Sequence, residues 1–267
     1  MARVSSGGVE IAYDIMNANG GGVPVFFLAG LNGMRQACMK QAIPFSRERP
    51  VIVQDQRGTG ESDKPRGVYS VGNFAKDVIA IMDAAGIERA HMVGTSTGGA
   101  IAQVLCIDYP DRVQSAAICC SWTRCDHFFR RQFEMRKRIL LSMGTEALML
   151  LTSTTLNDPR WFTEHYDELL ERERGLLERA GPPEVDAERI DAILAFDESM
   201  RLGRIKSPVI VIGAKNDAVC PPYYSEQLAA AIPGATLSLY EDGGHFFYLV
   251  YADRFNAQIR DFMSRHE

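Results

Sequence analysis

The sequence predicts an α/β fold in which helices cover both faces of a mostly parallel, doubly wound sheet. Short, continuous apolar runs such as residues 23–29 are typical of strands buried on both faces. These runs alternate along the chain with longer amphipathic segments, and that order indicates parallel strands joined by helices. From residue 123 to about residue 202 the alternation stops and only helical patterns remain.

Each element follows from its own local pattern. The expected strands cover residues 9–14, 23–29, 51–54, 91–94, 113–120, 209–214 and 235–240, and the expected helices outside the interruption cover residues 71–85, 101–109, 223–231 and 252–265. Within the interruption, Asn157-Asp158-Pro159 and Gly181-Pro182-Pro183 separate helical stretches. We therefore expect residues 1–122 and 203–267 to form the core, and residues 123–202 to form a helical cap over the carboxyl edge of the sheet.

Composition excludes several classes of protein. A chain of 267 residues with 46% hydrophobic and 24% charged content has enough apolar side chains for one large globular domain, and it is not of the disordered class. The net charge of −5 argues against a general nucleic-acid partner, because phosphate binding favours a basic surface. We expect no membrane span, because the apolar runs are shorter than the ~20 residues that a spanning helix needs.

The six cysteines do not form a CxxC pair or a zinc-ligand spacing. Buried free thiols are the simpler interpretation, and they fit a reducing compartment such as the cytoplasm. No secretory signal is visible at the N-terminus. We accordingly expect a cytoplasmic protein, monomeric or homodimeric, without a metal ion or cofactor.

The most informative motif is Gly94-Thr95-Ser96-Thr97-Gly98, which lies between an expected strand and an expected helix. This context is required for a nucleophile elbow, where a serine occupies a tight strand-to-helix turn. The residues two positions before and after the serine must be small because the backbone segments approach each other closely there. The motif predicts that Ser96 is a nucleophile at a helix N-terminus, where backbone N–H groups favour developing negative charge.

A serine nucleophile needs a general base, and histidine, with an ordinary pKa of about 6.5, is suited to that role. Of the five histidines, His245 follows the last expected strand in a glycine-rich loop, so we expect it at the carboxyl edge of the sheet. A carboxylate must hold the imidazole in one tautomer. Asp217 follows another buried strand and gives the chain order Ser, Asp, His. Asp126, which follows the strand preceding the cap, is the alternative.

The tetrahedral intermediate of acyl transfer needs two N–H donors. The residue after the nucleophile, Thr97, is expected to supply one. The second should come from the loop after the strand at residues 23–29, and Leu31 is the candidate.

These motifs, in this order, together with Asp55-Gln56-Arg57-Gly58-Thr59-Gly60-Glu61-Ser62, resemble the α/β-hydrolase superfamily. The resemblance is strongest to hydrolases like 3-oxoadipate enol-lactonase and aminoacrylate hydrolase. It implies a cap inserted after the sixth core strand and a serine hydrolase that needs no cofactor. The Asp55–Ser62 motif is interpreted as structural. The family usually has histidine before the oxyanion-loop glycine, whereas this chain has Ala29, so the support of that loop is an open question.

The expected reaction is cleavage of a carboxylic ester or lactone bond in a small molecule through an acyl-enzyme. The same triad type also cleaves amides, carbamates and carbon–carbon bonds of enol-ketone acids, and a non-catalytic receptor on this fold is the alternative of another class. Specificity should lie in the cap. Arg124 is the candidate for binding a substrate carboxylate, with Trp122 and Phe128 as candidate pocket residues.

Overall fold

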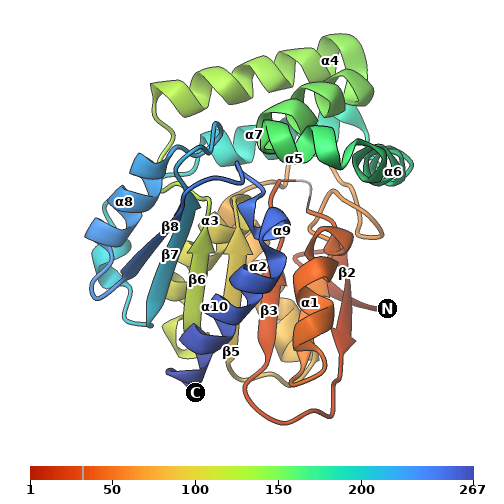
Figure 1. Ribbon diagram of the computed structural model, residues 1–267. Helices are drawn as coiled ribbons and strands as arrows, with labels where there is room; N and C mark the ends of the chain where they lie inside the picture. Colours follow the sequence, from red (N-terminus) through yellow and green to blue (C-terminus); the bar gives the residue numbers. More distant parts are fainter. Residues whose placement is uncertain (32) are drawn as a thin grey trace.

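A single eight-stranded sheet runs through the protein, in the order β1-β2-β4-β3-β5-β6-β7-β8 (Figure 1). The computed structural model describes residues 1–31 and 33–267. β3 to β8 are mutually parallel, whereas β2 is antiparallel to both β1 and β4, so the predicted mostly parallel sheet is confirmed. The strands are β1 (Ala2–Ser6), β2 (Val9–Met16), β3 (Val25–Leu28), β4 (Val51–Gln54), β5 (Ala90–Thr95), β6 (Val113–Cys119), β7 (Val209–Ala214) and β8 (Thr236–Tyr240).

Helices cover both faces of the sheet because the strand side chains alternate between two apolar clusters. In β3, Phe26 and Leu28 belong to one buried cluster, and Val25 and Phe27 belong to the other. The first cluster includes side chains of α2 (Val71–Ala84), α3 (Thr97–Asp108) and α8 (Pro222–Ala231). The second includes side chains of α1 (Met39–Phe45), α9 (Phe247–Val250) and α10 (Ala252–Ser264). Three short 3-10 helices are η1 (Arg35–Cys38), η2 (Pro110–Arg112) and η3 (Leu202–Arg204).

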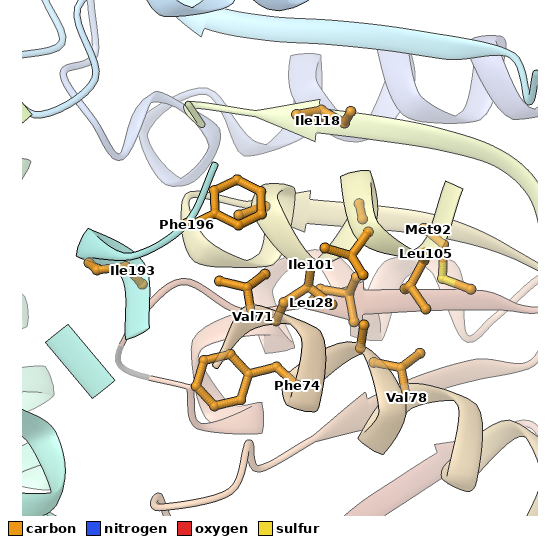
Figure 2. Packing of buried hydrophobic residues seen from close by; sticks show 14 of the residues in the cluster. Leu28, Val71, Phe74, Val78, Met92, Ile101, Leu105, Ile118, Ile193 and Phe196 are labelled. Atoms are coloured by element: carbon orange, nitrogen blue, oxygen red, sulfur yellow. The ribbon is translucent and has the colours of Figure 1, made fainter. Parts of the chain in front are cut away.

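Between β6 and β7 the chain forms four helices that lie across the carboxyl edge of the sheet (Figure 1). They are α4 (His127–Leu156), α5 (Pro159–Glu164), α6 (Tyr166–Leu177) and α7 (Pro183–Leu194). Ile193 and Phe196 join the same buried cluster as Val71 and Phe74 of α2 (Figure 2). These apolar contacts attach one side of the helical layer to the core. All four helices fall within residues 123–202, and the domain boundaries themselves remain a prediction.

α4 is apolar enough, by length and composition, to cross a membrane, and only 11% of its most apolar window is buried. The sequence analysis missed this stretch because glutamate, serine and threonine interrupt it. Gly144 has non-helical backbone angles (φ 88°, ψ 177°) and divides α4 into two parts. Each part is shorter than the ~20 residues of a spanning helix.

Other departures from the sequence prediction have local causes. The strand β1, with the sequence ARVSS, was missed because it lies at the edge of the sheet and lacks a buried apolar face. The helix α1 was missed because it is short and contains Pro44. The helix after the elbow begins at Thr97 rather than at residue 101, since its first turn consists of small residues without apolar periodicity.

Candidate active site

The turn between β5 and α3 forces Ser96 into an unusual backbone conformation (φ 54°, ψ −116°). Its flanking glycines are required by close backbone contacts. A Cβ atom on Gly94 would lie 2.2 Å from the carbonyl oxygen of Gly98, and a Cβ atom on Gly98 would lie 2.0 Å from that of Leu28. The expected reason for the small residues in the motif is therefore visible as two steric exclusions.

The backbone of Ser96 is fixed on both sides, while its hydroxyl is free. Its N–H donates to the carbonyl oxygen of Cys119 (2.8 Å), and its carbonyl oxygen accepts from the hydroxyl of Ser121 (2.9 Å). In the part of the chain that the structure describes, the Ser96 hydroxyl has no hydrogen-bond partner, and the residue is partly exposed. This arrangement leaves the oxygen available to a substrate and a base.

The second feature is a buried pair of Asp217 and His245, each of which is 3% exposed. Asp217 Oδ2 lies 2.8 Å from His245 Nδ1. The other carboxylate oxygen, Oδ1, accepts from the backbone N–H groups of Val219 and Cys220, both at 2.8 Å. These bonds fix the orientation of the carboxylate, and an Nδ1–H bond to it leaves the Nε2 atom of His245 as the free acceptor.

A glycine-rich turn carries His245 to this position. Gly243 and Gly244 have positive φ values of 99° and 64°. The N–H of Gly244 donates to the side-chain oxygen of Asn216 (2.9 Å), which ties the His245 loop to the Asp217 loop. A Cβ atom on Gly244 would lie 3.0 Å from the carbonyl oxygen of Leu156, at the end of α4. Glycine is needed here both for its φ value and for the close approach of the cap.

Cys120, at the end of β6, links the serine to the acidic residue in space. Burial raises the pKa of its thiol well above the ordinary value, and the charge of Asp217 adds to this shift. A hydrogen bond between the thiol and the backbone of Ser96 opposes the shift. One side chain thus contacts the elbow and lies within electrostatic range of Asp217, so the elbow and the Asp217–His245 pair share the carboxyl edge of the sheet. The structure shows no hydrogen bond between Ser96 and His245.

The predicted oxyanion donors lie on either side of the serine. A Cβ atom on Gly30 would lie 3.8 Å from Ser96 Oγ, so the loop that carries Leu31 passes directly beside the hydroxyl. Among the described residues, no acceptor receives a hydrogen bond from the backbone N–H of Leu31 or of Thr97. Both donors are therefore free to bind an external oxygen.

The open question at Ala29 has a structural answer. The side-chain nitrogen of Gln56 donates to the carbonyl oxygen of Ala29 (2.9 Å) and lies 3.5 Å from that of Gly30. The side-chain oxygen of Gln56 accepts from Arg189 of α7 (2.8 Å), and both side chains are 1% exposed. Sequence reasoning missed this support because it joins three segments that are far apart in the chain.

The alternative acid, Asp126, is committed elsewhere. It caps α4 by accepting from the N–H of Phe129 (2.9 Å), and it also accepts from the hydroxyls of Tyr223 (2.8 Å) and Tyr224 (2.5 Å). Burial opposes ionisation, but these hydrogen bonds outweigh it and hold the pKa of Asp126 below its ordinary value. The structure pairs His245 with Asp217 and not with Asp126.

The three candidate specificity residues are not gathered at the serine. Arg124 is exposed, and its backbone pairs with Asp197. Trp122 is fully buried against Phe129, with ring centroids 4.4 Å apart, and Phe128 is 46% exposed. The structure therefore gives no support for a carboxylate site at Arg124, because the chain turns into α4 and leaves this side chain in solvent.

The described residues contain no group of three or more His, Cys, Asp or Glu side chains arranged to hold a metal ion. Two surface hollows of about 600 and 580 Å³ lie beside α7, and neither is lined by Ser96, Asp217 or His245. The candidate site consists of the elbow, the Asp217–His245 pair and the oxyanion loop beneath the cap.

Comparison with known proteins decides the family. The family described as the alpha/beta hydrolase fold matches residues 23–251. The chain belongs to the α/β-hydrolase family. The resemblance inferred from the motifs is thereby confirmed, and the chain is a hydrolase of this fold. Which bond it cleaves is a separate matter.

Among the similar proteins is one from Azorhizobium caulinodans named "Putative carbamate hydrolase RutD", which is 36% identical over 262 residues and 98% of each chain. A protein of the same name from Caulobacter vibrioides is 31% identical over 268 residues, covering 98% of this chain and 99% of the relative. The solved enol-lactonase of Burkholderia xenovorans LB400 superposes with a TM-score of 0.91 at 24% identity, over 98% of this α/β-hydrolase and 100% of that chain. Est816, an N-acyl homoserine lactone degrading enzyme, superposes with a TM-score of 0.85 at 31% identity, over 98% and 100%.

Proposed function

We propose that this α/β-hydrolase cleaves a carboxylic ester or lactone bond of a small molecule through an acyl-enzyme formed on Ser96. The observation that supports this most directly is the buried Asp217–His245 pair at the same sheet edge as a strained serine with a free hydroxyl. A hydroxyl alone is a weak nucleophile, and an oriented imidazole that can accept its proton makes it reactive.

In the proposed reaction, Nε2 of His245 takes the proton of the Ser96 hydroxyl as the oxygen attacks the substrate carbonyl carbon. The N–H groups of Leu31 and Thr97 hold the resulting oxyanion. The intermediate collapses when the imidazolium protonates the leaving alcohol, and an acyl-enzyme remains. A water molecule that gives a proton to His245 then attacks the acyl carbon. The bond between this carbon and the Ser96 oxygen breaks, the imidazolium returns the proton to Ser96, and the acid is released. The carboxylate of Asp217 does not take up a proton, and it stabilises the imidazolium during both acylation and deacylation.

A carbamate is the second candidate substrate class. The relatives named as carbamate hydrolases are up to 36% identical over nearly the whole chain, and Est816 is named as a lactone-degrading enzyme. Carbamates and lactones both present a carbonyl carbon to a serine, so the same residues would serve both. The reactions differ in the group left on Ser96: a lactone or ester gives an acyl-enzyme, whereas an O-alkyl carbamate that loses its alcohol gives a carbamoyl-enzyme.

The test combines active-site labelling with a substrate panel. A fluorophosphonate probe should label the wild-type protein at Ser96, and Ser96→Ala should abolish both labelling and turnover. Ser142→Ala, which removes an exposed hydroxyl of α4, should change neither. Rates on a methyl ester, a γ-lactone and an O-alkyl carbamate then identify the bond. A folded wild-type protein that is not labelled and turns over none of them would point to a ligand receptor and contradict the proposal.

A further inference from the structure

Burial lowers the pKa of three guanidinium groups of the cap: Arg136 on α4 and Arg189 on α7 are buried, and Arg172 on α6 is half-buried. Two of them have acidic neighbours in the cap. Arg189 lies 3.5 Å from Asp186, one turn earlier on the same helix. Arg172 is influenced by Glu173 and Glu168 of its own helix. In the described part of the cap, no aspartate or glutamate is a comparable neighbour of Arg136.

The contacts of Arg136 are neutral. Its Nη2 atom donates to the hydroxyl of Thr155 (3.3 Å), and its guanidinium lies 4.6 Å from the centroid of the Phe133 ring. Within the described chain, no carboxylate lies within ion-pair distance of it. Among the described residues, the groups that act on it electrostatically are first the thiol of Cys220 and then the carboxylate of Asp217. The two oxygens of Asp217 are already occupied by His245 and by backbone N–H groups.

The position of Arg136 is set by contacts of the cap with both catalytic loops. Gln132, one helical turn before it, donates to the carbonyl oxygen of Val219 in the Asp217 loop (3.4 Å). Leu156, next to the Thr155 that Arg136 contacts, accepts from the N–H of Phe246 in the His245 loop (3.1 Å). The guanidinium is therefore located where α4 crosses over the proposed site.

The proton transfers proposed above do not require a cation at this position. A buried guanidinium without a counter-ion is unfavourable, because its desolvation is not compensated. An anionic substrate would remove this penalty, since it would neutralise the guanidinium each time the site fills.

We propose that Arg136 binds a carboxylate of the substrate, so that the serine hydrolase proposed above acts preferentially on anionic esters or lactones. The inference rests on that proposed function. Among these three cap arginines, Arg136 combines nearness to the Asp217 loop with the lack of a neighbouring cap carboxylate in the described part of the chain. It takes the role that the sequence analysis assigned to Arg124.

The experiment compares two esters that differ only in the group proposed to meet Arg136. Monomethyl succinate carries a carboxylate, and methyl levulinate carries a neutral methyl ketone in its place. The wild-type protein should show the higher kcat/KM for monomethyl succinate. Arg136→Met should lower the ratio of the two kcat/KM values roughly 10- to 100-fold, as expected for a lost charge-assisted hydrogen bond. Arg131→Met, at an exposed position on the same helix, should leave the ratio at the wild-type value.

The outcomes separate the two proposals. If the wild-type protein cleaves both esters with similar kcat/KM, or if Arg136→Met lowers both values by the same factor, the carboxylate site is refuted and the serine hydrolase stands. If neither ester is cleaved and Ser96 is not labelled by a fluorophosphonate, the proposed function itself fails. Should Arg136→Met not fold, inhibition of the wild-type protein decides: propionate should compete with the substrate and propionamide should not, and equal effects would overturn the proposal.

Discussion

Replacement of Ser96 by glycine should abolish activity and at the same time stabilise the protein. The backbone of Ser96 has φ 54° and ψ −116°, a region that residues with a Cβ atom occupy only with strain. Such strain amounts to about 1–3 kcal/mol. The serine hydroxyl has no hydrogen-bond partner among the described residues, so its removal loses no internal hydrogen bond.

The expected gain is the strain that is released minus the added flexibility of glycine in the unfolded chain. That flexibility costs about 0.5–1 kcal/mol, so Ser96→Gly should raise the free energy of unfolding by about 1 kcal/mol at the middle of the two ranges and by at most about 2.5 kcal/mol. For a chain of this size, the melting temperature should rise by a few degrees. Ser96→Ala is the matched control, because it removes the hydroxyl and keeps the Cβ atom that causes the strain.

Urea denaturation of the wild-type protein, Ser96→Ala and Ser96→Gly measures these differences, provided that the three m-values agree. Both variants should lose roughly 10⁴- to 10⁶-fold in kcat. A Ser96→Gly protein that is no more stable than Ser96→Ala would refute the reasoning, since it would mean that the elbow stores no strain at this residue.

Three further predictions concern the surroundings of the elbow. Asp217→Asn should lower kcat by roughly 10⁴-fold, because an amide favours the wrong tautomer of His245. In the same steady-state assay, Asp126→Asn should leave kcat within a few-fold of the wild-type value. Gln56→Ala should lower kcat about tenfold with little change in KM. This decrease in kcat is smaller than the ~10²-fold or larger decrease that follows the loss of a whole oxyanion donor. An unchanged kcat would rule out the supporting role of Gln56. Burial lowers the pKa of His91 from 6.5 to about 4; Glu267 opposes this shift, and Arg49 and His266 add to it. The unfolded chain therefore binds the proton first as the pH falls. The contribution of His91 to the free energy of unfolding is therefore complete above pH 6.5, and up to about 3 kcal/mol of it should be lost between pH 6.5 and pH 4. Urea titrations measure this loss, and a His91→Gln variant with the same pH dependence as the wild-type protein would contradict it.

Much of the fold could be predicted because its signals are local. The parallel strands are continuous apolar runs, and the elbow is defined by five consecutive residues around Ser96. The pairing of Asp217 and His245 could be predicted because each lies in the loop that follows a parallel strand, and the ends of parallel strands meet at one edge. The edge strand β1 could not be predicted in this way, because most of its residues are exposed and it has no buried apolar face.

The cap was harder, because its functional side chains depend on which way each helix faces. Nearness to the sheet edge in sequence favoured Arg124, yet that residue precedes α4 and remains in solvent. Arg136 lies on the buried stripe of the helix with Phe129, Phe133 and Leu140. A charged residue in an apolar stripe at spacings of three and four is visible in the sequence, and it is the signal that could have identified the buried arginine.

The substitution of Ala29 for the usual histidine shows how one support can replace another. We expect the predicted oxyanion loop to need a donor to its carbonyl groups so that its N–H groups keep their orientation, and alanine at position 29 has no side-chain donor. Gln56 supplies it from the neighbouring loop, and Arg189 holds Gln56 from the cap. Gly33 has a φ of 72°, which favours glycine, and a Cβ atom there would lie 2.4 Å from the Arg189 guanidinium. The predicted oxyanion loop is thus linked to α7 through Gln56 and Arg189, and we expect its geometry to depend on the cap.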